Sequence, residues 1–323
     1  MAIQGEGRAF DLIRCEDSEA WLRLRKEGVG GSDVAAIMGL SKWRTPAQVY
    51  VDKISDELGD DLSDKPYIRF GNLMEPVVGE EYERRHPGFT VRRVNAVCRS
   101  IDRPWAQASL DYEVRDPDRK GWGVLEIKTA RNADDWADGV PDYYLTQVTH
   151  YMSVTCRSYA DVAVFFRDTC EFGFYRIERD EEDIDLVDSA VDTFWNEFVL
   201  KRVEPELVGT ADEGRMLAEL HTPSDGEFAT PEDVSAADEL IAAYRDACER
   251  EKAAKDDKAK AATLLKGIIG DAKGIQTDVA RVTWVRSESR RFDSKRFKSE
   301  RPDDYEQYTV ATKRDGGLRI KES

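Results

Sequence analysis

The sequence predicts a mixed α/β core, in which a central sheet is flanked by helices, followed by an appendage of helix and short strands. Two observations support this fold class. Up to about residue 200, apolar residues recur with the spacing of helices in some stretches and of strands in others. Beyond that point, residues 231–273 are rich in alanine and charge, which is typical of a long helix or a helical hairpin. We therefore expect a core at residues 1–205, a linker at 206–230 and an accessory region at 231–323.

The first elements are predicted to be helices. Apolar spacing favours a helix at residues 18–25, and glycines then lead into a second helix with Ser32 or Asp33 as its N-cap. A third helix starts at Thr45, as the cap residue, and the proline that follows it. The turn before the second helix presents free N–H groups, so Ser32 and Arg25 are candidates for binding a phosphate. The alternative is a simple helix cap with Arg25 in solvent.

The rest of the core follows from the same patterns. A fourth helix is expected at about residues 68–84, where Pro76 predicts a kink or a later start because proline removes a helical hydrogen bond. Strands are expected at residues 90–94, 96–99, 105–110, 122–127, 159–166 and 172–177, and further helices at residues 143–154 and 184–198.

The residues with the clearest chemistry lie around a predicted hairpin. Glu126 and Lys128 are two apart on a strand and share a face, and a turn at residues 116–121 brings Asp111 beside Glu126. Two carboxylates and an amine would then converge. Carboxylate oxygens bind hard cations such as Mg²⁺, and a lysine beside them orients a water or offsets charge on a phosphate. The alternative is an exposed ion pair, which the apolar surroundings disfavour because buried charges must be paired or bound to metal.

Four motifs in order resemble a known family. Ser109-Leu110-Asp111 with Leu125-Glu126-Ile127-Lys128 resembles the PD-(D/E)xK nuclease motif, with Ser-x-Asp in place of Pro-Asp. The further segments GVGGSD at residues 28–33, GNLMEP at 71–76 and YYLTQVTHYM at 143–152 resemble the YqaJ-type viral recombinases, relatives of phage lambda exonuclease. The resemblance covers about residues 21–198. It implies a restriction-endonuclease-like core and a Mg²⁺-dependent exonuclease that resects one strand of linear double-stranded DNA, 5′ to 3′, in phage recombination.

The resemblance also implies roles for individual residues. Glu75 is placed like the helical carboxylate that completes the family's metal site, with Asp111, Glu126 and a backbone carbonyl such as that of Ile127. One or two Mg²⁺ ions are expected there, and Mn²⁺ should substitute. Gln147 matches a glutamine near the attacking water, although Thr149 replaces the second glutamine of the common QVQ pattern. Arg25 has the offset of the arginine that engages the 5′-phosphate in lambda-like exonucleases.

Composition sets limits on these expectations. The formal net charge of −17 argues against broad electrostatic attraction to nucleic acid, so basic residues must be gathered locally if DNA is the substrate. Five cysteines show no metal-ligand spacing, and the chain has neither a signal-peptide pattern nor a run of eighteen apolar residues. We therefore expect a soluble cytoplasmic protein of a bacterial or phage-infected cell.

The accessory region holds the densest basic cluster of the chain. This C-terminal basic cluster consists of Arg286, Arg290, Arg291, Lys295, Arg296 and Lys298. It lies between strands expected at residues 279–285 and 308–312. A solvated face and a clamp on the DNA backbone are equally good interpretations, because phosphate contacts need such a cluster.

Three other functions remain open at this point. A structure-specific or restriction-like endonuclease would use the same metal residues. A DNA-end-binding recombination scaffold of the same fold would bind termini without cleaving them. A recombination mediator would act chiefly through its C-terminal part, by recruiting a single-strand annealing protein. Relatives form rings of three subunits, so the resemblance also implies a homotrimer.

Overall fold

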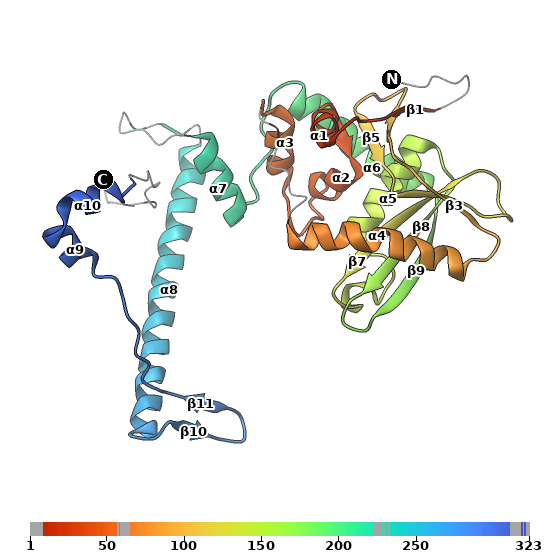
Figure 1. The fold of residues 1–323 in the computed structure, drawn as a ribbon. Helices are drawn as coiled ribbons and strands as arrows, with labels where there is room; N and C mark the ends of the chain where they lie inside the picture. Colours follow the sequence, from red (N-terminus) through yellow and green to blue (C-terminus); the bar gives the residue numbers. More distant parts are fainter. Residues whose placement is uncertain are drawn as a thin grey trace. The chain divides into compact units, whose positions relative to one another are not determined.

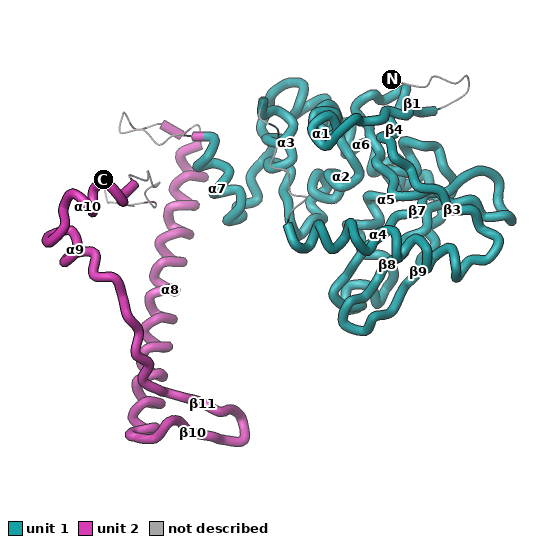
Figure 2. Tube along the Cα trace, viewed as in Figure 1, with its two compact units in different colours: residues 1–220 teal, residues 221–323 magenta. Residues whose placement is uncertain are grey.

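The computed structural model describes residues 9–56, 58, 65–221, 228, 230, 231, 233–310, 318 and 320. The chain forms two compact units, residues 1–220 and residues 221–323 (Figure 2). The stretch predicted as a linker, residues 206–230, contains helix α7 (Ala211–Leu220), and its residues 222–227 and 229 lie outside the described residues.

The first unit is built on two sheets (Figure 1). A five-stranded sheet has the strand order β3-β6-β7-β8-β9, and a four-stranded sheet has the order β1-β4-β5-β2. In the larger sheet β7 and β8 are parallel and the other neighbours are antiparallel, so the predicted mixed sheet is confirmed. The strands are β1 (Phe10–Ile13), β2 (Val29–Gly30), β3 (Thr90–Arg93), β4 (Val97–Ser100), β5 (Ala106–Ser109), β6 (Tyr112–Arg115), β7 (Gly123–Ala130), β8 (Tyr159–Phe166) and β9 (Glu171–Glu178).

Helices cover both faces of the larger sheet. On one face Val78 and Tyr82 of α4 pack in a cluster with Leu125 of β7, and on the other Met152 of α5 packs in a cluster with Val124. The helices of this unit besides α7 are α1 (Ser18–Lys26), α2 (Gly31–Ile37), α3 (Pro46–Ile54), α4 (Pro66–Arg85), α5 (Asp142–Thr155) and α6 (Glu181–Thr193), which continues into a π-helical segment, Phe194–Val199. The smaller sheet was not predicted as a separate layer, because its strands are only two to four residues long.

One local prediction is wrong, and one of two alternatives for another is excluded. The N-cap of α2 is Gly30, whereas Asp33 is the third helical residue and its Oδ2 accepts a hydrogen bond from the Gly30 N–H at 3.3 Å. Helix α4 begins at Pro66, close to the predicted start at residue 68, so Pro76 lies inside the helix and the later start is excluded. At Pro66 a missing N–H costs nothing because the first turn has no intrahelical acceptor. Packing of α4 on the sheet beyond Pro76 then offsets the absence of one hydrogen bond inside the helix.

A buried ion cluster ties the first three helices together. Asp33 is fully buried, and Lys53 Nζ of α3 lies 2.8 Å from its Oδ2. Arg44 Nη1 and Arg25 Nη2 lie 2.9 Å and 3.6 Å from its Oδ1. Although burial raises the pKa of the Asp33 carboxyl, Lys53, Arg25 and Arg44 hold that pKa below its ordinary value of 3.8. The carboxylate is therefore ionised, and it fixes the position of Arg25 on α1.

A second buried cluster fixes α4 on the larger sheet. Tyr82 of α4 donates its hydroxyl hydrogen bond to Asp161 of β8. Asp161 also accepts a hydrogen bond from Arg176 Nη2 at 2.8 Å, and Arg176 Nη1 donates to Asp116 Oδ2 at 2.8 Å. Because buried polar groups are expensive to leave unpaired, this cluster holds α4 at one lateral position.

The second unit is built around one long helix. Residues 234–269 form one helix, α8 (Val234–Ile269), rather than a helical hairpin, and Gly270 ends it with a φ of +54°. The predicted strand at 279–285 is shortened to β11 (Arg281–Thr283), which pairs with β10 (Gly274–Gln276). Helices α9 (Ser294–Glu300) and α10 (Pro302–Gln307) follow. Of the strand predicted at 308–312, residues 308–310 do not form a strand, and residues 311 and 312 lie outside the described residues. In the part of the chain that the structure covers, every helix is too short or too polar to cross a membrane.

We expect the change Asp33→Ala to lower the free energy of unfolding by about 3–5 kcal/mol, because it leaves the buried Lys53 ammonium without its carboxylate. Urea unfolding followed by circular dichroism measures this difference. The matched control is Asp135→Ala, since Asp135 pairs with Lys42 in solvent, and its effect should stay below about 1 kcal/mol. Equally small effects in the two variants would contradict the role given to the cluster.

The stabilisation that Asp33 provides should also depend on pH. Because the pKa of Asp33 is lower in the folded state, its contribution to stability is complete above the ordinary value of 3.8 and is lost as pH falls below it. The difference in unfolding free energy between wild type and Asp33→Ala should therefore be constant from pH 7 to about pH 5 and shrink only below about pH 4. A difference that already shrinks at pH 6 would show that another group is responsible.

Candidate functional site

Asp111 lies where the chain passes from one sheet to the other. It follows β5 of the smaller sheet and precedes β6 of the larger one, and Val94 occupies the equivalent place between β3 and β4. The Val94 N–H donates to the Asp111 carbonyl oxygen at 3.1 Å, and the Asp111 Oδ2 accepts a hydrogen bond from the Ile127 N–H at 2.8 Å. Two hydrogen bonds with backbone N–H groups therefore hold this residue beside β7.

Glu126 and Lys128 share the face of β7 that is covered by α5. Lys128 Nζ lies 2.6 Å from Glu126 Oε1. Gln147 of α5 joins both side chains, because its Oε1 accepts from Lys128 Nζ at 3.1 Å and its Nε2 donates to Glu126 Oε1 at 2.8 Å. The structure thus brings together four residues that the sequence selected: Asp111, Glu126, Lys128 and Gln147.

Three carboxylates line a single cavity. Its volume is about 280 Å³, and Glu75 of α4, Asp111, Glu126, Ile127 and Lys128 all contribute to its wall. The Glu75 Oε1 accepts a hydrogen bond from Arg93 Nη2 at 2.7 Å. The structure therefore places Glu75, which the residues alone gave no reason to select, in the same cavity as the hairpin carboxylates.

The carboxylates of this cavity are costly to ionise as they stand. Burial and, next, the charge of Asp111 raise the pKa of Glu126 to about 8, against the opposing effect of Lys128. Burial raises the pKa values of Asp111 and Glu75 as well. Burial lowers the pKa of Lys128, but the carboxylates of Glu126 and Asp111 raise it above its usual value. Lys128 and Arg93 thus face three acidic groups, one more than the two cations neutralise.

The donor set fits a hard divalent cation. Glu126 Oε2 is buried and has no hydrogen-bond partner within the described chain, which is costly for a carboxylate oxygen. Among the residues described, no group of three or more His, Cys, Asp or Glu is arranged to hold a metal ion as it stands. Mg²⁺ does not need such a group, because it keeps several waters and is commonly held by one or two carboxylates. Asp111 and Glu126 would suffice for that mode of binding.

Arg25 and Ser32 are neighbours at the start of α2. Arg25 Nη2 donates to Ser32 Oγ at 3.5 Å, and its guanidinium lies 4.8 Å from the ring centroid of Trp21. About 28% of the Arg25 side chain is exposed, so it remains accessible to a ligand. Helix α2 packs against α5, the helix that carries Gln147.

The C-terminal basic cluster belongs to the second unit. Its members lie between β11 and α9 or on α9 itself, and all six are exposed. Arg296 Nε donates to Glu300 Oε1 at 2.8 Å, and Lys298 Nζ lies 5.1 Å from the Tyr305 ring centroid.

Sequence reasoning missed two tyrosines that contact the site residues. Tyr151 accepts a hydrogen bond at its hydroxyl from Gln147 Nε2 at 2.9 Å, and the ring centroid of Tyr144 lies 4.8 Å from Lys128 Nζ. Both lie within about one helical turn of Gln147, so the spacing i−3 and i+4 could have revealed them. His150 is fully buried with its Nε2 3.0 Å from the Gln107 carbonyl oxygen, in agreement with an ordinary core histidine.

Comparisons with known proteins show the family to which the chain belongs. Residues 20–158 match the YqaJ-like viral recombinase domain. Over 307 residues the chain is 31% identical to the uncharacterized protein YqaJ of Bacillus subtilis (strain 168), a match that covers 91% of both chains. The fold is mixed α/β, and its cavity holds a cluster of acidic groups beside a lysine. The chain belongs to the YqaJ-like viral recombinase family.

Two solved structures resemble part of the chain. The alkaline exonuclease LHK-Exo from Laribacter hongkongensis is 22% identical with a TM-score of 0.48, and the match covers 63% of this chain and 100% of that one. A phage related exonuclease from Haemophilus somnus 129PT is 16% identical with a TM-score of 0.39, covering 54% of this chain and 96% of the other.

We expect the change Gly31→Ala to disturb the site through its supporting helix. A Cβ at residue 31 would lie 2.4 Å from Tyr151 Cε1 and 3.0 Å from Gln147 Cγ, so α2 and α5 would have to separate. Such overpacking should lower the free energy of unfolding by about 1–3 kcal/mol in a urea titration. The control Gly214→Ala in α7 adds a Cβ in open space and should stabilise by up to about 1 kcal/mol. A neutral effect of Gly31→Ala would contradict the close packing.

Proposed function

We propose that this protein is a divalent-metal-dependent deoxyribonuclease, an exonuclease that resects one strand of linear double-stranded DNA in phage-type recombination. One observation carries the proposal: Asp111, Glu126 and Lys128 meet in one cavity, where a buried carboxylate oxygen has no hydrogen-bond partner in the described chain. Membership of the viral recombinase family supports it.

Each residue of the cavity would have a distinct role. Asp111 and Glu126 would hold Mg²⁺, or Mn²⁺ in its place, with Glu75 and the carbonyl of Ile127 as further oxygen donors for one or two ions. The bound ion supplies Lewis-acid activation of water and neutralises charge on the phosphate. Lys128 then orients the attacking water and offsets negative charge that develops on the phosphate oxygens. Gln147 would hold the side chains of Lys128 and Glu126 in place through its two hydrogen bonds.

Arg25 and Ser32 would hold the phosphate at the DNA end. Arg25 is partly exposed and lies beside the Ser32 hydroxyl at the first turn of α2, where backbone N–H groups also favour an anion. Binding a 5′-phosphate there would set the polarity of resection as 5′ to 3′. Asp33, which pairs with Arg25, keeps the guanidinium in place without exposing its own carboxylate.

Partners follow from the same proposal. The substrate is the end of duplex DNA, and the C-terminal basic cluster would clamp the DNA backbone. A ring of three subunits would account for processive action, and a single-strand annealing protein would receive the strand that resection exposes. We place these steps in the cytoplasm of a bacterial or phage-infected cell.

An end-labelled linear duplex tests the central proposal. With Mg²⁺ the wild type should release nucleotides, whereas Glu126→Gln and Lys128→Ala should slow release at least ~100-fold, the scale of removing one group that stabilises transition-state charge. EDTA should abolish release and Mn²⁺ should restore it. A covalently closed circle should survive. Cleavage of the circle would identify an endonuclease instead, and bound ends without release would identify a scaffold.

The DNA end itself tests Arg25. Duplexes with and without a 5′-phosphate should be degraded at different rates by the wild type, and Arg25→Ala should remove that difference because the charge-assisted hydrogen bond to the phosphate is gone. The control is Arg23→Ala, because Arg23 is exposed on the same helix and pairs with Glu19. If Arg25→Ala keeps the phosphate preference, another residue reads the end.

The salt dependence of DNA binding tests the basic cluster. Changing Arg290 and Arg291 to Ala should weaken binding to all duplex sequences. The slope of log K against log salt should become shallower by about 0.9 for each phosphate that is no longer neutralised. The matched control is Lys201→Ala with Arg215→Ala, because both side chains are exposed and lie outside the cluster. Unchanged affinity and slope in the Arg290 and Arg291 variant would leave the cluster as a solvated face.

A further inference from the structure

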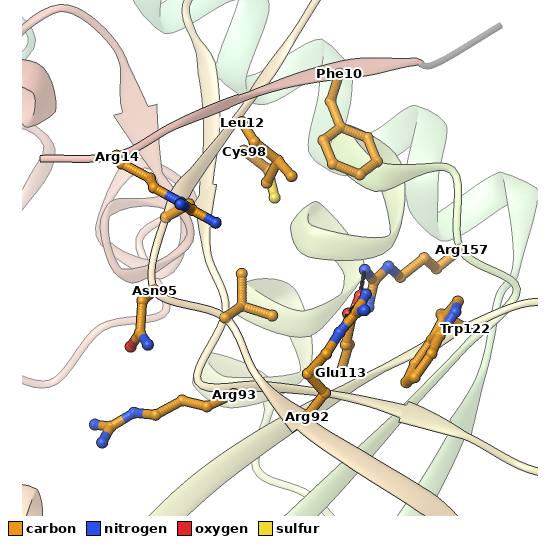
Figure 3. A pocket seen from close by; sticks show the side chains of 12 residues that line it. Phe10, Leu12, Arg14, Arg92, Arg93, Asn95, Cys98, Glu113, Trp122 and Arg157 are labelled. Atoms are coloured by element: carbon orange, nitrogen blue, oxygen red, sulfur yellow. Dashed lines mark hydrogen bonds and ion pairs between the residues drawn. The ribbon is translucent and has the colours of Figure 1, made fainter. Parts of the chain in front are cut away.

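A second cavity, lined by arginines, is separate from the acidic one. Its volume is about 850 Å³, and its wall comes from β1, β3, β4, β6 and the residues just before β7 and just after α5 (Figure 3). Four of its lining residues are arginines, Arg14, Arg92, Arg93 and Arg157, against the single carboxylate of Glu113. In a chain with a net charge of −17, this balance makes a local positive surface.

The carboxylate does not neutralise the arginines around it. Glu113 pairs with both Arg92 and Arg157, and 64% of the Arg92 side chain remains exposed. Arg14 is exposed and has no hydrogen bond or ion pair with any residue that the structure describes. In Figure 3 Arg14 extends over the cavity from the end of β1. Arg14 is therefore available to phosphate oxygens, and Arg92 keeps an exposed surface beside it.

The cavity also offers flat groups on which a base can stack. The Arg92 guanidinium lies over the Trp122 ring, 4.6 Å from its centroid. Indole rings and guanidinium planes are the surfaces on which proteins stack unpaired bases. Bases in a duplex keep their faces covered by neighbouring pairs, so this lining favours a single strand over a double one.

This cavity shares a wall with a second one that lies beside the predicted end-binding residues. Val94, Asn95 and Ala96 line it on one side and line a neighbouring cavity of about 250 Å³ on the other. Trp21, on whose ring Arg25 lies, lines that neighbouring cavity. The shared wall includes Val94, which is hydrogen-bonded to the backbone of Asp111. The two cavities thus lie on either side of one short segment, next to the strand crossing at Asp111.

We propose that these two cavities form one groove that binds single-stranded DNA, with Arg14 on the phosphates and a base stacked on the Arg92–Trp122 pair. The inference rests on the proposed nuclease function, which it deepens by assigning a place to an unpaired strand. The groove would hold one strand apart from its complement, beside the strand crossing at Asp111. Such separation is useful because hydrolysis at an end requires the strands to part.

Binding without cleavage tests the groove. The probe is a fluorescent oligothymidine strand, and its anisotropy is measured in EDTA so that no hydrolysis occurs. Trp122→Ala should weaken binding about tenfold, the scale of one stacked base, and Arg14→Ala should reduce the salt slope by roughly 0.7 for one phosphate contact. The control Arg215→Ala removes an exposed arginine on α7 and should change neither quantity.

The outcomes separate this groove from the nuclease proposal. If the wild type degrades DNA with Mg²⁺ but neither Trp122→Ala nor Arg14→Ala alters oligothymidine binding, the groove is wrong and the nuclease stands. If the two variants lose binding while no protein cleaves DNA under any metal, the nuclease proposal fails and the groove stands. Circular dichroism checks that both variants keep the wild-type fold.

A different observation concerns α8, the long helix of the second unit. Nearly all of its residues are exposed, including Leu240 at 73% and Ile268 at 70%. Leu240, Tyr244, Leu265 and Ile268 share one stripe with the three-and-four spacing of a heptad repeat. Between them the stripe continues with alanines, apart from Glu251 and Lys258. An apolar stripe of this period fits a partner helix.

The charges of α8 identify that partner. Residues 234–251 carry five acidic and two basic side chains, a net charge of −3, whereas residues 252–269 carry two acidic and five basic ones, a net charge of +3. The helix dipole favours such a bias only within the first and last turns, so it does not explain charges along the whole length. Two antiparallel copies would place each acidic half beside a basic half, whereas parallel copies would repel.

We infer that α8 pairs with α8 of a second copy of this chain as an antiparallel coiled coil. In that arrangement Leu240 and Tyr244 lie at the level of Leu265 and Ile268 of the second copy. Apolar side chains would therefore pack together at both ends of the helix pair. Glu251 and Lys258 then lie near the centre, close to the opposite charges of the second copy. The inference does not depend on the nuclease proposal, and the pair would link two copies through the second unit whether each copy is otherwise single or belongs to a ring of three.

Two charge variants of the full chain test the pairing. One changes Lys255, Lys258 and Lys260 to Glu, and the other changes Asp246, Glu249 and Glu251 to Lys, so both halves of each α8 carry the same net sign. Light scattering after gel filtration should show a lower mass for each variant alone than for the wild type, and the wild-type mass again after mixing. Equal masses for all samples, or no recovery on mixing, would overturn the inference. Circular dichroism confirms that α8 stays helical.

Discussion

The constraint on which this site depends is the burial of several carboxylates around one amine. Glu126 accepts hydrogen bonds from Lys128 and Gln147 at one oxygen and has none at the other within the described chain. Asp111 and Glu75 lie in the same cavity, and burial raises the pKa values of all three acids. An arrangement that costs free energy in the protein alone would become favourable if the proposed divalent cation neutralised it. The cavity is therefore better suited to binding a cation than to stabilising the fold.

The surrounding structure keeps this group of like charges in place. Asp111 is fixed because it lies at the crossing between two sheets, where backbone groups of Val94 and Ile127 bind it. Helix α4 carries Glu75 and is fastened to the sheet by Tyr82 through Asp161. Helix α5 carries Gln147 and packs closely on α2. Rigid elements thus hold each charged group from a different direction, as a preorganised site requires.

The sequence alone predicted most of the site residues, but fewer of the contacts that hold them in place. The alternation of residues 122–128 and the polar turn before them predicted one strand of the hairpin and its turn, because strand period and turn chemistry are local properties. The other strand is β6, which was not predicted, and the predicted strand at 105–110 belongs to the smaller sheet as β5. The position of Asp33 was misjudged, since its burial depends on Lys53 and Arg44, which come from elements later in the chain. The second sheet, the tyrosines beside Gln147 and the arginine-lined cavity arise from packing between distant segments. Packing of that kind leaves no periodic pattern in the sequence.

The most direct measurement is the position of a bound cation. Crystals grown with Mn²⁺ and measured for anomalous scattering should show a peak between the carboxylate oxygens of Asp111 and Glu126, at the oxygen distances of a divalent ion. The same experiment on the Glu126→Gln protein should show that peak weakened or lost. A peak elsewhere in the chain, or none while both carboxylates face bulk water, would contradict the account.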